Sequence, residues 1–198
     1  TVSPELVTII LNDLAEFPLL KDTSGYLAIK LVMNNEIETT SVLNLIKKKK
    51  KEIRYALIEI PRKFNRILVL PSKAGKQYII MLDDVIRYNL SSIFNIFDYE
   101  SISAHMIKIT RDAQLDIDSD MSKSMLEKIA TSVKERRIGE PVRFVYDSEI
   151  EKDTLQFFLS KMNIDASDSI IPGGRYHNRR DYMAFPNLGR FDLLYQPK

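Results

Sequence analysis

Two strand-like segments separated by an amphipathic helix, within residues 142–171, constrain the fold more than any other part of the chain. Residues 142–146 predict a strand, and residues 151–163 predict a helix with one apolar face. That face consists of Leu155, Phe158, Leu159 and Met162. Residues 168–171 predict a second strand. A right-handed β–α–β crossover would place the two strands side by side, or nearly so, in one sheet.

Alternating apolar residues predict a larger sheet around this unit. A strand is expected after Gly25, with Leu27, Ile29, Leu31 and Met33 on one face. Further strands are predicted at 53–60, 66–70, 76–82 and 103–110. The third and fourth of this larger set are joined by a turn that contains Pro71 and Gly75. Residues 6–14 fit either a helix or a strand, with a slight preference for a strand.

Helical patterns complete the predicted fold. Asp83 and Asp84 are expected to cap a helix whose buried face carries Ile86, Leu90 and Ile93. Apolar residues at every fourth position predict a longer helix over 119–138, and a short helix is expected over 181–185. We therefore predict an α+β fold, in which a mixed β-sheet of several strands is flanked by amphipathic helices. The chain is expected to form one domain, residues 1–198, excised from a longer protein.

Composition excludes several classes of protein. The net charge is +2, with 29 basic and 27 acidic residues, so overall charge does not indicate a nucleic-acid partner. The chain has no cysteine, which excludes disulfides, thiolate metal sites and a cysteine nucleophile and is consistent with a cytoplasmic protein. No apolar run reaches the ~18 residues that a transmembrane helix requires. Two histidines are too few for an imidazole metal site, and we predict none.

The strongest candidate for a binding site is the basic turn at 172–180. Pro172, Gly173 and Gly174 end the second strand of the β–α–β unit, where α/β proteins often bind anions. Its candidate anion ligands are Arg175, His177, Arg179 and Arg180. The alternative is a structural turn with solvated arginines, and spacing alone favours that alternative.

Two other features carry weaker signals. Lys47–Lys51 form a run of five lysines, for which a solvated hairpin tip is the default and a clamp for a polyanion is the alternative. A lone histidine within a strand, His105, is more often a packing residue than a catalyst. Neither histidine has a nucleophile or an orienting carboxylate at a diagnostic spacing, so no complete active site is predicted.

Several blocks of sequence carry a family resemblance. They are RYALIEIP at 54–61, FDY at 97–99, MIKITRDA at 106–113, GEPVRFVYD at 139–147, IPGGRYHN at 171–178 and FPNLG at 185–189. In this order they resemble the middle, or head, domain of bacterial polyphosphate kinase of the first type. The resemblance covers nearly the whole chain. The segment 34–51 is longer and richer in lysine than this family's pattern suggests.

The resemblance implies a parent enzyme that transfers the terminal phosphate of ATP to inorganic polyphosphate with the help of Mg²⁺. A phosphohistidine intermediate is implied, in catalytic domains that lie outside this chain. Neither His105 nor His177 matches that histidine, so no catalytic residue and no cofactor is assigned to residues 1–198. The implied partners of this domain are the other domains of the same kinase and a second copy in a homo-oligomer. The implied location of the parent is the cytoplasm, with membrane association as an alternative.

Three functions follow as hypotheses. The first is a scaffolding and dimerisation domain of the kinase. The second is a module that binds polyphosphate or nucleic acid through the basic turn at 172–180. The third, an autonomous phosphotransferase that uses His177, is the weakest, because the groups that would support such a histidine are missing.

Overall fold

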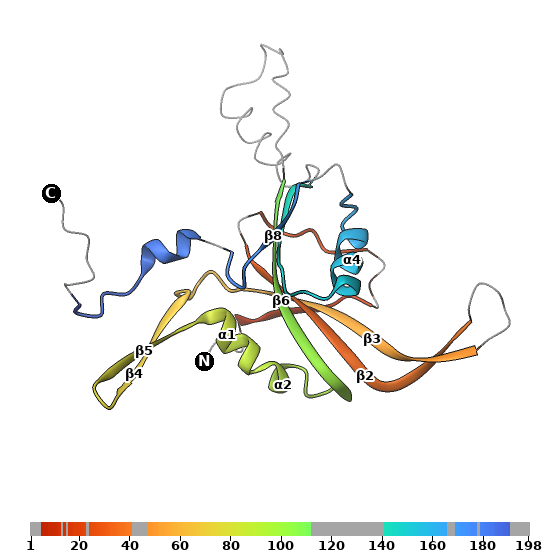
Figure 1. Cartoon of the computed structure of the whole chain (residues 1–198), viewed down its shortest axis with the longest axis horizontal. Coiled ribbons are helices and arrows are strands. Elements are labelled where there is room, and N and C mark those ends of the chain that lie inside the picture. The colour runs from red at the N-terminus through yellow and green to blue at the C-terminus, as the bar shows by residue number, and fades with distance from the viewer. Residues whose placement is uncertain are drawn as a thin grey trace, which may run out of the picture.

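The computed structural model shows a six-stranded sheet with helices on both faces and a separate two-stranded hairpin (Figure 1). The structure describes residues 5–12, 14, 16–22, 24–40, 47–111, 141–165, 169–177 and 179–190. Within these ranges it describes only the backbone of residues 36–40, 47–49, 141–142 and 179–180. The predicted α+β class with a mixed sheet is confirmed.

The sheet combines antiparallel strands with a parallel pair. Its strands in spatial order are β1 (Val7–Ile10), β3 (Lys47–Glu59), β2 (Tyr26–Thr40), β6 (Tyr99–Arg111), β7 (Pro141–Asp147) and β8 (Ser169–Gly173). Strands β7 and β8 run parallel, and the other neighbours in this order run antiparallel. The ambiguous segment 6–14 therefore contributes a strand, β1, rather than a helix.

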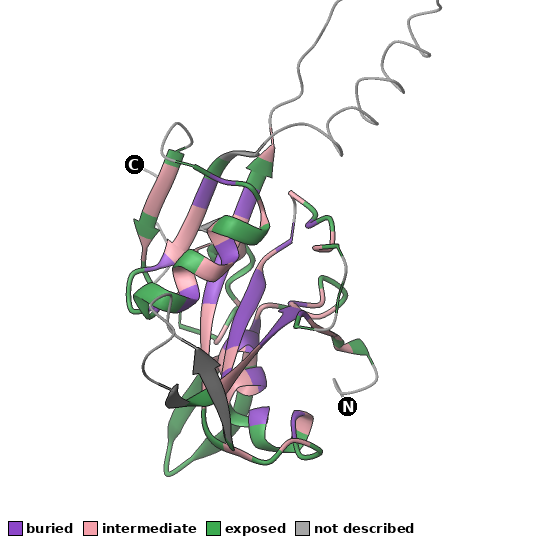
Figure 2. Cartoon of the chain, turned by 90° about the vertical axis from the view of Figure 1, so that its right-hand side faces the viewer, coloured by how far each residue is buried: buried purple, intermediate pink, exposed green. Residues whose placement is uncertain are grey.

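Strands β2 and β3 are buried on both faces over part of their length, because successive side chains of a strand point to opposite sides. In β2 the predicted apolar face, which includes Leu27 and Ile29, packs toward α1 (Leu82–Tyr88) and α2 (Leu90–Ile93). Tyr26 and Ala28 belong to the opposite cluster, beneath α4 (Lys152–Lys161). Figure 2 shows this buried centre in purple.

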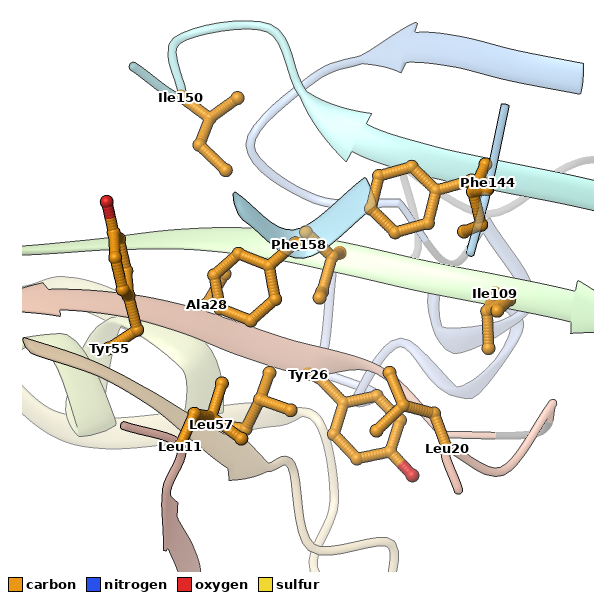
Figure 3. Close-up of a cluster of buried hydrophobic side chains, with 12 residues drawn as sticks. Leu11, Leu20, Tyr26, Ala28, Tyr55, Leu57, Ile109, Phe144, Ile150 and Phe158 are labelled. Atoms are coloured by element: carbon orange, nitrogen blue, oxygen red, sulfur yellow. The ribbon is translucent and has the colours of Figure 1, made fainter. Parts of the chain in front are cut away.

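The core beneath α4 is built around aromatic side chains (Figure 3). Phe158 of α4 and Phe144 of β7 are fully buried, and Phe157 stacks on Tyr55 of β3 with ring centroids 3.9 Å apart. Burying a phenylalanine side chain contributes about 1.5–3 kcal/mol to folding. This cluster fixes the helix of the β–α–β unit against the sheet, as the apolar face of 151–163 predicts.

The predicted β–α–β unit is confirmed, but its last strand is longer than expected. Arg143 of β7 pairs in parallel with Ser169 of β8, and the pairing continues to Asp147 and Gly173. The strand therefore does not stop before Pro172. A proline is tolerated there because β8 is an edge strand of the sheet, where one side of the backbone needs no ladder partner.

The five lysines are not at a loop tip, which corrects the prediction for this segment. Lys47–Lys51 begin β3 and pair with residues 36–40 of β2 in a long hairpin. The backbone register sets Lys51 opposite position 36 and Lys49 opposite position 38. The Lys51 ammonium also forms an ion pair with Glu100 of β6.

The hairpin of β4 (Ile67–Lys73) and β5 (Lys76–Met81) turns later than predicted. Pro71 lies inside β4, and the turn consists of Ala74 and Gly75, with φ of 52° and 72°. Two consecutive positive φ values are typical of a tight two-residue hairpin turn. The hairpin leads directly into α1, and α2 follows after a break at Asn89.

Asp83 and Asp84 lie in the first turn of α1, but they do not cap it. The N-cap position is Met81, and no side chain there accepts a hydrogen bond from the helix. Both carboxylates are instead held by ion pairs with other parts of the chain. The predicted helix 119–138 lies outside the described residues. No helix in the described part of the chain is long and apolar enough to cross a bilayer.

Candidate functional site

The segment after β8 is fastened to α1 through Asp84. Arg175 donates hydrogen bonds to Asp84 Oδ1 from Nη2 at 2.7 Å and from Nε at 3.1 Å. Tyr176 donates from its hydroxyl to Asp84 Oδ2, and Arg87 Nη1 of α1 adds a fourth hydrogen bond, to Asp84 Oδ1 at 3.0 Å. Burial alone would raise the pKa of Asp84, but the hydrogen bonds from Tyr176 and Arg175 outweigh burial and lower it.

A second, more deeply buried pair lies on the neighbouring residue of α1. Asp83 is fully buried and accepts two hydrogen bonds from Arg66, one of them from Nη2 to Oδ2 at 2.5 Å. The Nη1 atom of Arg66 donates to Asp181 Oδ2 at 3.0 Å. Asp181 belongs to η2 (Arg179–Ala184), so Arg66 joins the base of the hairpin, α1 and the C-terminal segment.

These contacts decide where the predicted anion ligands lie. Arg175 is committed to Asp84, and the His177 ring lies against β8, where a Cβ added at Gly173 would come within 3.0 Å of Nε2. Burial lowers the pKa of His177, against opposing effects of the Gly174 backbone and the Asp147 carboxylate. Only the backbone of Arg179 and Arg180 is described. The anion site at 172–180 therefore stays a prediction.

A polar cluster that spacing could not indicate surrounds His105. Its Nδ1 lies 3.4 Å from Asp147 Oδ2, at the end of β7, and its Nε2 lies 3.5 Å from Glu151 Oε2, just before α4. The Ser103 hydroxyl contacts the same Glu151 oxygen at 3.4 Å rather than the histidine. The cluster is therefore not a nucleophile–base arrangement, and His105 bridges the sheet to the β7–α4 turn.

A groove of about 460 Å³ lies beside the Arg66 network. It is formed by residues from the segment before β2, from the loop between β3 and β4, from β6 and from η2. Three cationic side chains line it, Arg62, Arg66 and Lys108, together with the two acidic residues Asp22 and Asp181. Its volume lies within the range of sites that bind small ligands.

Sequence reasoning misses the residues that organise this region. The pattern favours helix caps at Asp83 and Asp84, although their partners Arg66 and Arg175 lie 17 and 91 residues away in the chain. Lys108 lies within the block MIKITRDA that carries the family resemblance, but nothing local marks it as a groove residue. The one sequence signal that could have identified Lys108 is that a cationic residue stands among apolar residues in a strand.

Comparison with known proteins identifies the family. A family model described as polyphosphate kinase middle domain matches residues 1–185. The polyphosphate kinase of Vibrio parahaemolyticus is 37% identical over 201 residues, which cover 99% of this chain and 27% of that protein. The polyphosphate kinase of Escherichia coli K12 is 38% identical over 190 residues, covering 94% of this chain and 25% of that protein.

A solved structure shares the fold. The crystal structure of polyphosphate kinase from Porphyromonas gingivalis aligns with a TM-score of 0.67 and 23% identity, covering 100% of this chain and 25% of that chain. This chain thus spans about a quarter of the length of the relatives that it matches.

Proposed function

Because the chain belongs to the polyphosphate kinase middle domain family, we propose that it is one domain of a larger phosphotransferase. The whole enzyme transfers the terminal phosphate of ATP to inorganic polyphosphate, in the cytoplasm, with Mg²⁺ as its metal. The chemistry passes through a phosphohistidine in a domain outside residues 1–198. The observation that carries this proposal is the match of residues 1–185 to the middle domain, with 37–38% identity to proteins named polyphosphate kinase.

Within that enzyme the domain serves as a scaffold and as a dimerisation element. The feature that supports this role is the hairpin of β4 and β5, which projects away from the main sheet (Figure 1). Four large apolar side chains on it are 40–45% exposed, namely Val69, Leu70, Tyr78 and Ile79. An isolated two-stranded hairpin is marginally stable in water, so burial of these side chains would stabilise it.

We propose that a second copy of the chain binds to this hairpin. In the described part of the chain β4 and β5 pair only with each other, so each strand has a free edge. Two such hairpins related by a two-fold axis can pair edge to edge and bring the same apolar side chains of the two copies side by side. The contact is self-complementary, as a closed dimer requires.

The oligomeric state tests this role directly. Light scattering with size-exclusion chromatography is expected to show a dimer for the wild-type chain and a shift toward monomer for Ile79→Ser. Ile96→Ser removes an isoleucine that is 83% exposed near the end of α2, away from the hairpin, and should leave the dimer unchanged. A wild-type monomer, or a dimer that survives Ile79→Ser and a second substitution at Val69, contradicts the dimerisation role.

The alternative function, a polyanion-binding module that uses the turn at 172–180, makes a different prediction. For this turn to bind polyphosphate, the Arg175 guanidinium must break its ion pair with Asp84, or it must contact Asp84 and the ligand at the same time. An Arg175→Gln variant would then lose affinity for polyphosphate in a salt-dependent way. If the affinity of this variant for polyphosphate is unchanged, Arg175 does not contribute to such a site.

A further inference from the structure

The His177 side chain lies in a tight niche, and both of its ring nitrogens are buried without a hydrogen-bond partner in the described part of the chain. The ring lies so close to Gly173 that a Cβ added there would come within 3.0 Å of Nε2 and 3.1 Å of Cδ2. The same Cβ would lie 3.1 Å from Val145 Cγ1. The niche therefore accepts the flat imidazole because residue 173 has no side chain.

The niche is on the side of the sheet that faces α1. Phe144 and Tyr146 of β7 belong to the core beneath α4, so Val145 between them points to the other side of the sheet. Lys108 of β6 is the register partner of Val145 and points to that side as well. His177 thus covers the α1-facing side of β7 and β8.

His177 belongs to a segment that is fixed on both sides of it. We call this segment, the described residues 174–177 and 179–184 between β8 and the end of η2, the strap (Figure 1). Its anchors are two ion pairs, Arg175–Asp84 and Asp181–Arg66. Histidine is the side chain that ordinarily changes its charge between pH 5 and 8, and His177 is the one histidine in the strap.

The charges around His177 do not offset its burial. They come from each element packed around the ring, namely Asp147 of β7, Asp83 of α1, Lys108 of β6 and Arg66 before β4. Burial lowers the pKa of His177, although the Gly174 backbone and the two carboxylates act against it. Both carboxylates have other partners, because Asp83 is paired with Arg66 and Asp147 lies 3.4 Å from His105. The neutral imidazole is therefore the form that the niche accepts.

We propose that His177 is a pH-sensitive latch for the strap. The neutral ring stays in the niche and holds the strap against β7 and β8. The protonated ring leaves the niche for water, and the strap loosens between its two ion-pair anchors. This inference does not depend on the proposed role in a kinase.

The direction of the pH effect follows from the burial of the ring. The closed strap is fully stable above the ordinary histidine pKa of 6.5, and it loses stability as the pH falls from there through the lower pKa of the closed form. At pH 5.5, one unit below the ordinary value, the ratio of closed to open strap should fall by up to ~10-fold.

Nuclear magnetic resonance tests the latch directly, because the chain has two histidines and His105→Gln assigns their imidazole signals. We expect His177 to titrate below pH 6.5. The nuclear Overhauser contact between its ring and the Val145 methyl groups should disappear along the same curve. Titration at or above pH 6.5, or a contact that persists after His177 is protonated, overturns the proposal.

Urea denaturation at pH 7.5 and pH 5.5 measures the linked loss of stability. The His105→Gln background is used throughout, so that His177 is the remaining histidine. Between the two pH values its folding constant should fall by up to ~10-fold more than that of the same chain with His177→Phe. Phenylalanine places an apolar ring of similar shape in the niche and takes up no proton. Equal changes in the two chains would contradict the latch.

Gly173→Ala tests the niche while retaining His177, and it decides the matter if His177→Phe fails to fold. The φ of Gly173 is not positive, so alanine disturbs the packing rather than the backbone. The added Cβ should displace the ring, so that at pH 7.5 the contact with Val145 is already lost and His177 titrates closer to 6.5. Gly174→Ala meets no atom within 4 Å and should change neither result. A Gly173→Ala chain with the wild-type contact and titration would overturn the proposal.

Discussion

Replacement of Asp83 by asparagine should destabilise the domain strongly, because it leaves the Arg66 guanidinium without its main partner. Asp83 is fully buried, and Arg66 is only 12% exposed in its side chain. Removing one member of a buried ion pair typically costs about 3–5 kcal/mol, because the other charge stays buried and unpaired. Arg66 keeps Asp181 as a second partner, so we expect the lower end of that range, about 3 kcal/mol.

Urea denaturation followed by circular dichroism measures this loss as a change in the free energy of unfolding. For a chain of this length, about 3 kcal/mol corresponds to a melting temperature lower by about 6–12 °C. The matched control is Asp153→Asn, which makes the same chemical change in the ion pair with Lys30. That carboxylate is half exposed, and such pairs contribute about 1 kcal/mol or less. Equal losses in the two variants would refute the assignment of Arg66–Asp83 as the pair that holds α1 to the hairpin.

Two further predictions concern the same face of the sheet. The lowered pKa of Asp84 in the folded state means that its contribution to stability is present above the unfolded pKa, near 3.8, and is lost as the pH falls through the folded value. Asp84→Asn should flatten the dependence of unfolding free energy on pH in that acidic range, and an unchanged slope would contradict it. Gly25→Ala places a Cβ in steric overlap with Met106 Cε, the flexible end of a buried side chain that must shift, and should cost about 1 kcal/mol in chemical denaturation. In Gly174→Ala the added Cβ meets no atom within 4 Å, so the free energy of unfolding should hardly change. Equal losses of stability in the two variants would show that the overlap with Met106 is not the cause of the loss in Gly25→Ala.

Local patterns are sufficient to predict much of the sheet. The alternation of Leu27, Ile29 and Leu31 requires only that one face of a strand be buried, and the structure buries that face completely. The β–α–β unit follows from local patterns and one general rule of handedness. For the lysine run, charge repulsion within the segment suggests a loop, whereas the backbone of residues 47–51 pairs with residues 36–40 of the neighbouring strand.

The candidate site could not be predicted in the same way, because its contacts join residues that are far apart in the sequence. Arg66 and Asp181 are separated by 115 positions, and His105 and Asp147 by 42. A pair of aspartates at the start of a helix is compatible with capping, with an ion pair or with both, and only the fold selects among these.

The central claim is that this chain is a domain of a polyphosphate kinase whose phosphorylated histidine lies elsewhere. Phosphopeptide mapping of the full-length enzyme after incubation with labelled ATP and Mg²⁺ tests it most directly. The label is expected on a histidine outside residues 1–198, and it should persist when both His105 and His177 are replaced by alanine. Label on either of these histidines, or a full-length enzyme that transfers no phosphate to polyphosphate, would contradict the claim.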